Sequence, residues 1–324
     1  TLEFKPHREL YEWFLNQLPK ENKILPKQRE FARLNMSYTI MSKRKLSYLI
    51  EKKIVSSWDD PRMPTISGMI KRGYPPNALI NFVKKAGIAK RENTIDVSLM
   101  EFYVREELNK TCPRVMVVTD EIKLVIINYP ENKHEILEAI NNPEDESQGK
   151  RKMTLSKHLY IEREDFRETA SRKFFRLTIG KEVRLKNAYI IKAENCIKNE
   201  KGEVIEVHCT YDPKSKSGSN TEESQRKVKG TIHWVDINSS IDVNINEYDR
   251  LFFKEKPEEN DDLLKGVNTN SKKSIVGKSE HFVSSLQKGQ KVQFQRKGYY
   301  IVDSNEGGTI SFNKTVSLRD GWKK

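Results

Sequence analysis

Three consecutive cations follow an apolar, strand-like stretch near the start of the sequence, in IMSKRKL at residues 40–46. Lysine side chains on a loop can reach the oxygens of a polyphosphate and stabilise negative charge that develops at a transferring phosphorus. A run of cations is also commonly a solvated surface. The stretch is therefore a candidate phosphate-binding segment, and its surroundings have to decide between the two interpretations.

A second stretch, WDDPRMPTISGMIKRGY, begins at Trp58 and combines backbone-fixing residues with charge. Its prolines restrict φ, and Gly68 and Gly73 permit close approach of neighbouring backbone. Its two aspartates can cap a turn or form an ion pair with Arg62. The pattern predicts a specifically folded turn rather than a variable loop.

The composition favours a polyanionic partner. The 324 residues, enough for two or three domains, include 59 Lys and Arg against 46 Asp and Glu, giving a net charge of +13. Such an excess is typical of nucleic-acid-binding proteins, although it also occurs without specific binding. Cys112, Cys196 and Cys209 show no Cys-x-x-Cys spacing, which predicts free thiols in a reducing compartment. No apolar run approaches the roughly 20 residues of a membrane helix.

The elements that must position these residues change in character along the chain. The first third has helical periodicity, and helices are predicted at residues 8–18, 75–86 and 94–109. Their predicted apolar faces are Leu10, Phe14 and Leu18; Leu79, Phe82, Val83 and Ala86; and Val97, Met100, Val104 and Leu108. Near Pro113 the period changes to 2, which is typical of strands.

Short strand-like runs joined by polar turns fill the rest of the sequence and favour antiparallel barrels over alternating strands and helices. In EVRLKNAY, Val183 and Leu185 are expected to face a barrel core, and Arg184 and Lys186 to face outward. Polar connections are predicted at residues 141–152, 212–227 and 255–274, the last two of them mobile.

Together, the two opening stretches resemble the second half of the catalytic domain of class I aminoacyl-tRNA synthetases. IMSKRKL is similar to the KMSKS signature loop in its glutaminyl and glutamyl form, and WDDPRMPTISG to the segment that follows it in glutaminyl-tRNA synthetases. In the strand-rich half, GKEVRLKNAYIIKAE, KVKGTIHWV, YDRLF and NKTVSLRDGW resemble the anticodon domains of bacterial-type glutaminyl enzymes. The chain is identified as a member of this family from Thr1 to Trp322.

The resemblance implies a multidomain α+β fold. It would contain the C-terminal end of a Rossmann-type catalytic domain with the signature lysine loop, a helical connecting domain and two antiparallel, anticodon-binding β-barrels. The implied domains are residues 1–50 (catalytic), 51–112 (connecting), 113–160 with 245–322 (proximal barrel) and 161–244 (distal barrel).

The resemblance also implies an activity, that of a glutamine–tRNA ligase. The family uses ATP with Mg²⁺ to form glutaminyl adenylate and pyrophosphate, and then transfers glutamine to its tRNA. Its members are cytoplasmic and mostly monomeric, with no membrane association. Class I enzymes carry an H-x-G-H motif early in the nucleotide-binding fold, and this sequence has no such motif. The chain is therefore expected to begin within that domain and to be inactive alone.

For the catalytic part, the resemblance assigns roles to the cation run. Lys43 corresponds to the signature-loop lysine that stabilises the phosphates in the transition state, and Ser42 and Met41 shape the loop. Ile40 stands where the signature has its first lysine, so Lys43 is expected to carry more of the role.

Residues upstream of the cation run are assigned to the substrates. Arg33 and Leu34 correspond to positions that contact the adenosine of ATP, and Gln28 to a position near the bound glutamine. Without the resemblance, the same residues are read as a buried strand with an exposed arginine.

For the anticodon, the resemblance assigns five residues of the strand-rich half. Arg184 and Lys186 correspond to readers of the first base, Arg176 to a reader of the third, and Arg114 and Gln293 to readers of the central uridine. Arginine and glutamine commonly recognise splayed, single-stranded bases through their edges.

Three positions depart from the family pattern. Lys186 stands where arginine is frequent, which removes the planar fork needed for a bidentate contact. Lys173 and Phe175 replace polar contacts before Arg176. Phe175 is interpreted as a core residue rather than a residue that stacks on a base.

Two alternatives stay open. One is a non-bacterial-type glutamyl-tRNA synthetase, which shares WDDPR, although the following MPTISG favours the glutamine branch. The other is a standalone RNA-binding module without catalysis. VGKSE at residues 276–280 lacks the glycine spacing of a P-loop, and EENDD from Glu258 is interpreted as a polar loop rather than a metal site.

Overall fold

In the computed structural model, the described residues are 4–19, 25–259 and 262–320. The chain divides into two compact units. Unit 1 comprises Thr1–Met69, Tyr74–Val104 and Asp249–Ser271. Unit 2 comprises Ile70–Gly73, Arg105–Tyr248 and Lys272–Lys324.

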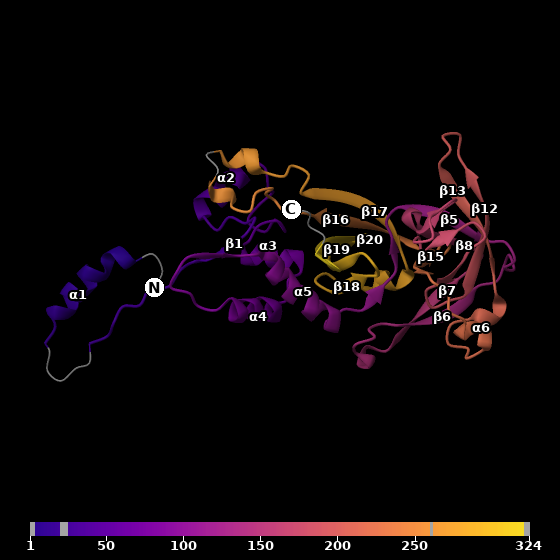
Figure 1. Cartoon of the computed structure of the whole chain (residues 1–324), viewed down its shortest axis with the longest axis horizontal. Helices are drawn as coiled ribbons and strands as arrows, with labels where there is room; N and C mark the ends of the chain where they lie inside the picture. The colour runs from indigo at the N-terminus through magenta and orange to yellow at the C-terminus, as the bar shows by residue number, and fades with distance from the viewer. Residues whose placement is uncertain (1–3, 20–24, 260–261, 321–324) are drawn as a thin grey trace. The chain divides into compact units, whose positions relative to one another are not determined.

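Unit 1 is built from helices and one short pair of parallel strands, β1 Leu34–Met36 and β2 Asn93–Ile95 (Figure 1). The helices in this part of the chain are α1 Arg8–Asn16, α2 Lys43–Glu51, α3 Ile66–Arg72, α4 Pro76–Ala86 and α5 Val97–Thr111. The C-terminal residues of α3 and α5 belong to unit 2. Helices α1, α4 and α5 confirm the three predicted ones.

The predicted apolar faces of these helices are confirmed unevenly. All four apolar residues predicted for α5 are buried. In α4, Phe82 is buried as predicted, but Val83 is 55% exposed, so that face was predicted too wide. No residue of α1 is buried, and Leu10 and Phe14 are both more than half exposed. Helical spacing predicts the helix correctly without showing what, if anything, covers its apolar face.

The prediction of a mobile connection at residues 255–274 is wrong. This segment contributes Leu263 and Val267 to the core of unit 1, where they join a buried cluster with Ile40 and Leu49. In Figure 1 the segment is drawn in orange beside α2. Its apolar residues are few, which is why the sequence pattern resembles that of a loop.

The predicted turn after α2 is confirmed. Asp60 is buried and accepts hydrogen bonds from Nε of Arg62 at 2.9 Å and from its Nη2 at 2.8 Å. Burial raises the pKa of Asp60, but the bonds from Arg62 and from the backbone N–H of Ser56 outweigh it and lower the pKa to about 2. A Cβ on Gly68 would lie 2.7 Å from the carbonyl oxygens of Asp60 and Met63, so this turn requires glycine.

The first barrel of unit 2 is a seven-stranded sheet with the order β14-β11-β12-β13-β5-β8-β15. Its strands are β5 Glu121–Ile126, β8 His158–Glu162, β11 Glu182–Leu185, β12 Ile190–Lys198, β13 Val204–Tyr211, β14 Thr231–Ile232 and β15 Trp234–Asp236. The two edge strands, β14 and β15, are consecutive in the chain and separated only by His233, so the sheet nearly closes on itself. Val183 and Leu185 lie in its core, as predicted.

Smaller elements complete this barrel. The strands β6 Glu135–Ile140 and β7 Lys150–Leu155 form an antiparallel pair, and β9 Phe166–Arg167 and β10 Leu177–Thr178 form a parallel one. Helix α6 Glu222–Gln225 lies within the predicted mobile connection at residues 212–227, which is therefore a folded segment.

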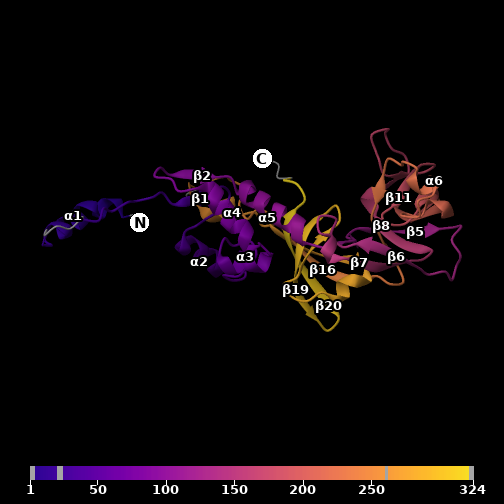
Figure 2. The ribbon, with the colours of Figure 1, turned by 90° about the horizontal axis from the view of Figure 1, so that it is seen from below.

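The second barrel is a seven-stranded sheet with the order β3-β18-β19-β20-β16-β17-β4. Its strands are β3 Arg114–Val115, β4 Val117–Val118, β16 Ile241–Tyr248, β17 Lys272–Ser279, β18 Lys291–Phe294, β19 Gly298–Glu306 and β20 Thr309–Ser317 (Figure 2). Here the edge strands β3 and β4 are separated only by Met116, and this sheet also nearly closes. The predicted mixed fold with two barrels is confirmed.

One strand-like run contributes to both barrels. Side chains alternate along an extended chain, and Val115 and Val117 enter the core of the second barrel, whereas Met116 and Val118 enter the core of the first. The run from Arg114 to Val118 is therefore buried on both faces, which explains why its sequence is almost continuously apolar.

The strand pairing differs from the predicted domain boundaries. Strands β5 and β8 lie within residues 113–160, which were expected to join residues 245–322, but they pair within the first barrel. Residues 249–271, expected in a barrel, group with unit 1. A period-2 pattern identifies a strand without identifying the sheet that it joins.

Candidate functional site

The cation run of unit 1 lies at the start of a helix rather than on a long loop. Met41 and Ser42 lie outside the regular elements, and Lys43 begins α2. Ser42 is the N-cap residue, but its side chain makes no capping hydrogen bond. The helix dipole disfavours cations in a first turn, so the exposed Lys43 and Arg44 lower the stability of this end of α2 and favour an anion beside it.

Glu258 contacts this segment from a distant part of the sequence. Its Oε1 accepts a hydrogen bond from the N–H of Met41 at 3.2 Å, and its Oε2 lies 3.7 Å from Nη2 of Arg33. Its carbonyl oxygen accepts from Nζ of Lys45 at 3.0 Å. One acidic residue therefore brings together Arg33 and the cation run, two of the predicted ATP-contacting regions.

The remaining residues predicted on the nucleotide side have other contacts. Leu34 is the first residue of β1, and Nε of Arg33 donates to Oδ1 of Asn35 at 2.9 Å. Gln28 lies in irregular chain before β1, where it donates to the carbonyl oxygen of Phe4 at 3.2 Å and contacts Glu30. The bond from Gln28 is the main cause that lowers the pKa of Glu30.

In unit 2, Arg114 and Gln293 lie side by side, because β3 and β18 pair in parallel with these two residues opposite each other. Nε2 of Gln293 donates to the hydroxyl of Tyr299 at 2.9 Å, and this hydroxyl donates to Oδ1 of Asn109 at 3.2 Å. Nη2 of Arg114 donates to the same oxygen at 2.9 Å, and Arg114 also contacts the side chain of Asn142. The two predicted readers of the central base therefore belong to one hydrogen-bonded cluster.

Arg184 is half-buried, and its guanidinium is engaged by the folded segment that follows β13. Its Nη1 donates to the carbonyl oxygen of Ser215 at 2.9 Å and to Oγ of Ser217 at 3.3 Å. Its Nη2 donates to the carbonyl oxygens of Ser224 at 2.8 Å and Arg226 at 3.4 Å. Burial, followed by the charge of Arg226, lowers the pKa of Arg184.

Lys186 and Phe175 are both exposed. Lys186 follows β11, and its carbonyl oxygen accepts from Nε1 of Trp234 at 2.9 Å. The interpretation of Phe175 as a core residue is wrong, because its side chain is 53% exposed and Nζ of Lys229 lies 5.8 Å from the centre of its ring. The neighbouring Phe174 is the partly buried one. When two phenylalanines are adjacent, the sequence alone does not indicate which of them enters the core.

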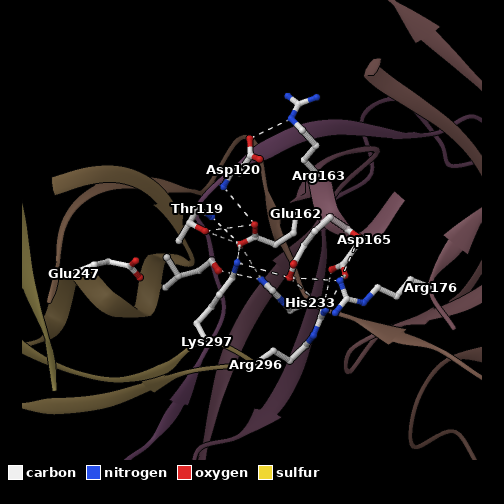
Figure 3. A network of polar contacts seen from close by, with 12 residues as sticks. Thr119, Asp120, Glu162, Arg163, Asp165, Arg176, His233, Glu247, Arg296 and Lys297 are labelled. Atoms are coloured by element: carbon white, nitrogen blue, oxygen red, sulfur yellow. Dashed lines mark hydrogen bonds and ion pairs between the residues drawn. The ribbon is translucent and has the colours of Figure 1, made fainter. Parts of the chain in front are cut away.

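Arg176 lies in a cluster of charges where the two barrels meet (Figure 3). Its Nη1 donates to the carbonyl oxygen of Glu164 at 3.2 Å and lies 3.2 Å from Oδ1 of Asp165. Asp165 is completely buried and accepts two hydrogen bonds from Arg296, at 2.5 Å and 2.7 Å. The predicted reader of the third base is thus held on one side by a carboxylate that it shares with a second arginine.

Glu162 forms the other half of this cluster. It is buried, it accepts a hydrogen bond from the N–H of Thr119 at 2.8 Å, and Nζ of Lys297 lies 3.1 Å away. Nε2 of His233 lies 3.6 Å from Glu162 and 3.0 Å from the carbonyl oxygen of Val117. Burial raises the pKa of Glu162, but His233, Lys297 and the bond from Thr119 outweigh it and lower the pKa to about 2.

The residues that hold these candidates in place are not indicated by any pattern in the sequence. They are Glu258 in unit 1 and Asn109, Asp165 and Arg296 in unit 2. None belongs to a motif, and each of them has a partner far away in the sequence. The acidic run that contains Glu258 is visible in the sequence, but its contacts depend on the tertiary fold.

Some further features bear on the site. Cys112, Cys196 and Cys209 are free thiols, as predicted. Within residues 4–19, 25–259 and 262–320, no helix is long and apolar enough to cross a membrane. Across the same residues, no group of three or more His, Cys, Asp or Glu side chains is arranged to hold a metal ion.

Family models match most of the chain. The model described as tRNA synthetases class I (E and Q), catalytic domain, matches residues 1–110. Two models described as anti-codon binding domains of the same class match residues 112–212 and 231–303. The matches separate the chain into a catalytic part and a strand-rich, anticodon-binding part.

Whole-chain similarity leads to named relatives. The chain is 48% identical to the glutamine–tRNA ligase of Clostridium perfringens, 49% to that of Rhodopirellula baltica and 47% to that of Colwellia psychrerythraea. Each match covers 100% of this chain but only 58%, 54% and 58% of those proteins, respectively. The chain therefore spans a little more than half the length of these relatives.

Proposed function

The chain belongs to the class I tRNA synthetases for glutamate and glutamine, and from this premise we propose that it acts as part of a glutamine–tRNA ligase, binding the anticodon of glutamine tRNA and contributing to the ATP site. One observation carries the proposal. The pairing of β3 with β18 puts Arg114 and Gln293 on adjacent strands of one barrel, and they are connected through Asn109 and the hydroxyl of Tyr299.

The chemistry of these groups suits an unstacked pyrimidine. The Watson–Crick edge of uracil presents two carbonyl acceptors and one N–H donor. Arg114 supplies donors, and the amide of Gln293 supplies a donor and an acceptor. The amide nitrogen donates one hydrogen to Tyr299 and has a second one, and the amide oxygen can accept from the N–H of the base. We assign the central anticodon base to this pair.

Arg176 is assigned to the third base. All its contacts with described residues involve Nη1, on Asp165 and Glu164. The opposite edge, formed by Nε and Nη2, has no partner among the described residues and presents the planar fork that arginine uses on base edges. Arg176 is held on one side and open on the other.

For the first base, Lys186 is better placed than Arg184. Lys186 is exposed, whereas Arg184 is half-buried and donates to four oxygens of the segment after β13, at Ser215, Ser217, Ser224 and Arg226. A lysine contributes a point charge rather than a bidentate fork, so we expect weak discrimination at this base.

The reaction of the family proceeds in two steps. A carboxylate oxygen of glutamine attacks the α-phosphorus of ATP, the bond to the β-phosphate breaks, and pyrophosphate leaves. The terminal ribose hydroxyl of the tRNA then attacks the acyl carbon, and AMP leaves. We assign to Lys43, positioned by Met41 and Ser42, the stabilisation of phosphate charge in the first step. Arg33 and Leu34 would contact the adenosine, and Gln28 would lie near the glutamine. Mg²⁺, usually held by substrate phosphates, would neutralise charge on ATP.

The relatives named above are translation enzymes, and we propose accordingly that this protein works in the cytoplasm as a monomer. The family models describe both glutamate and glutamine enzymes, so a glutamyl-tRNA synthetase is the second candidate. Charging assays with each amino acid, on a protein with the full length of the relatives, distinguish the two. The similarity to glutamine–tRNA ligases predicts charging with glutamine.

The test of the proposed function is the binding of this chain to glutamine tRNA and to the same tRNA with a changed anticodon, at fixed physiological salt. We expect a clear preference for the glutamine anticodon, because the readers assigned above lie in the folded barrels. Equal affinity would reduce the function to a basic RNA-binding surface, and the residue assignments would have to be withdrawn.

Lys43→Ala tests the catalytic assignment in a protein with the full length of the relatives. We expect slower adenylate formation with little change in tRNA affinity, because a contact made only in the transition state lowers the rate without changing ground-state binding. Pyrophosphate release is the measurement, and Lys53→Ala, a lysine beyond α2, is the control. An unchanged rate would remove Lys43 from the mechanism.

A further inference from the structure

The position of Arg176 is determined by backbone pairing. Strands β9 and β10 run parallel, with Leu177 opposite Phe166. The residues that precede them, Arg176 and Asp165, are therefore brought next to each other. The Nη1 of Arg176 lies 3.2 Å from Oδ1 of Asp165 as a result.

Asp165 is itself held from the other barrel. It is completely buried in the first barrel, and both its oxygens accept hydrogen bonds from Arg296, which lies in the turn between β18 and β19 of the second barrel. Figure 3 shows Asp165 between Arg176 and Arg296. Nη1 of Arg296 also lies 3.2 Å from Nδ1 of His233, the residue between the edge strands of the first barrel.

The turn that carries Arg296 has an uncommon conformation. Its φ is +67°, in the left-handed region that residues other than glycine rarely adopt. This backbone directs Arg296 to Asp165, and the next residue, Lys297, lies 3.1 Å from Glu162. Burial opposes the charge of Arg296, but Asp165 and the neighbouring glutamates outweigh it and raise its pKa. The contacts that fix this turn are therefore with the first barrel.

We propose that Asp165 and Arg296 are positioning residues for anticodon recognition: Arg296 of the second barrel fixes the carboxylate of Asp165, which in turn fixes the guanidinium of Arg176 against the third base. The inference rests on the proposed function, because it presumes that Arg176 reads that base. It makes discrimination at the third base depend on a turn that does not itself touch the base.

Holding Arg176 in place should favour recognition because it lowers the entropy that the side chain loses on binding. A long side chain that is free in solution loses rotamer entropy when it binds, and a side chain held beforehand loses less. Asp165 holds one nitrogen of Arg176 and leaves the opposite edge exposed to a ligand. Two arginines share this carboxylate, so without its negative charge they would repel each other and Arg176 would lose its fixed orientation.

The experiment measures the dissociation constant of the full 324-residue chain for glutamine tRNA and for three versions of it, each with one anticodon base replaced. The discrimination at a base is the ratio of the constants for the replaced and original tRNA. The variants are Asp165→Asn, Arg296→Ala, Arg296→Lys and Arg176→Ala. Arg163→Ala is the matched control, because it lies in the same turn after β8 but pairs with Asp120.

We expect Arg176→Ala to lower discrimination at the third base about tenfold, the usual order for a lost base contact. Asp165→Asn and Arg296→Ala should lose most of the same factor while discrimination at the central base stays unchanged. Adding Asp165→Asn to Arg176→Ala should cost nothing further, since both act through one contact. Arg296→Lys keeps the charge but not the planar fork of arginine, so its discrimination at the third base should lie between that of Arg296→Ala and that of the parent chain. Arg163→Ala should discriminate as well as the parent chain.

Thermal unfolding of each variant shows that it is folded at the assay temperature, and Arg296→Lys keeps the proposal testable if a neutral variant unfolds. The proposal is overturned if Arg176→Ala loses third-base discrimination while Asp165→Asn and Arg296→Ala keep it. It is also overturned if these variants lose discrimination equally at all three bases, because their role would then be structural. If the parent chain shows no preference at the third base, the proposed function itself fails, and this inference fails with it.

Discussion

Single side chains in this protein separate into those that hold the fold and those that stay available to a ligand, and residue type alone does not distinguish them. Arg184 and Lys186 alternate with buried residues on the same strand-like run, as predicted. Arg184 donates to three carbonyl oxygens and one hydroxyl, whereas Lys186 is exposed. The same outward-facing pattern thus contains one structural cation and one accessible cation.

Arg184→Ala should therefore destabilise the protein. The change leaves the carbonyl oxygens of Ser215 and Ser224 without their donor, and an unsatisfied half-buried acceptor costs about 1–3 kcal/mol. Lys186→Ala should change stability by less than about 0.5 kcal/mol, as is usual for exposed positions. Urea unfolding of the two variants measures the difference. If both are equally stable, the hydrogen bonds of Arg184 do not hold the segment after β13.

Phe175 is expected to affect RNA binding rather than stability, because an exposed aromatic ring beside Arg176 is available to stack on a base. Stacking of a single-stranded base on an aromatic ring contributes about 1–3 kcal/mol. We expect Phe175→Leu to weaken binding of glutamine tRNA about fivefold or more, and Phe175→Tyr to retain affinity. Equilibrium binding at fixed salt is the measurement.

The control for Phe175 is Phe253→Leu, which changes a phenylalanine of similar exposure in unit 1. If the two leucine variants bind the tRNA equally well, Phe175 makes no contact with a base. At this scale the sequence predicts residue types and faces well. It fails at Phe175 because two neighbouring rings compete for one place in the core, and at Asp165 because its partner Arg296 lies in a turn far away in the sequence.

At the scale of elements, the two edge strands of each barrel follow one another in the chain and are separated by a single residue. These separating residues are Met116 and His233. The N–H of Met116 and the ring nitrogens of His233 make polar contacts at the junction between the barrels. The N–H of Met116 donates to Oε1 of Glu280 at 2.6 Å, and Glu280 forms a buried ion pair with Arg151 at 2.8 Å. Each barrel is therefore completed by contacts with the other, and we expect them to unfold together.

Glu162, between the barrels, predicts how the stability of this junction depends on pH. Its pKa is about 2 in the folded protein against an ordinary value of 4.5. Folding therefore favours the ionised carboxylate, and the stabilisation is complete above about pH 4.5 and lost as the pH falls toward 2. A shift of this size corresponds to about 3 kcal/mol. Glu162→Gln should be less stable at neutral pH and lose less stability between pH 4.5 and 2.

Urea unfolding across that pH range tests the prediction. Glu138→Gln is the control, because Glu138 forms an exposed pair with Lys150, and such pairs contribute little. Parallel pH profiles for Glu162→Gln and the parent chain would show that Glu162 does not couple the junction to protonation. Strand periodicity predicted that these elements exist. It did not predict the junction, because the contacts across the junction join residues far apart in the sequence, such as Asp165 and Arg296.

At the scale of the whole molecule, the net charge of +13 predicts strong salt dependence of RNA binding. Each phosphate that the protein neutralises releases a counterion, so the affinity falls linearly on a double logarithmic plot against salt. If six or more phosphates are contacted, we expect a loss of about a thousandfold between 50 and 200 mM salt. A flat series would contradict an electrostatic contact with the RNA backbone.

The salt series also separates the roles of individual cations. A residue that contacts phosphate lowers the slope by about 1 when it is removed, whereas a residue that reads a base edge changes discrimination and leaves the slope unchanged. We expect Arg176→Ala to keep the slope of the parent chain and lose discrimination at the third base, and Lys229→Ala, which removes the cation beside Phe175, to lower the slope and keep discrimination. The reverse result would assign Arg176 to the RNA backbone. Together the slope and the discrimination ratio distinguish a protein that only attracts RNA from one that reads an anticodon.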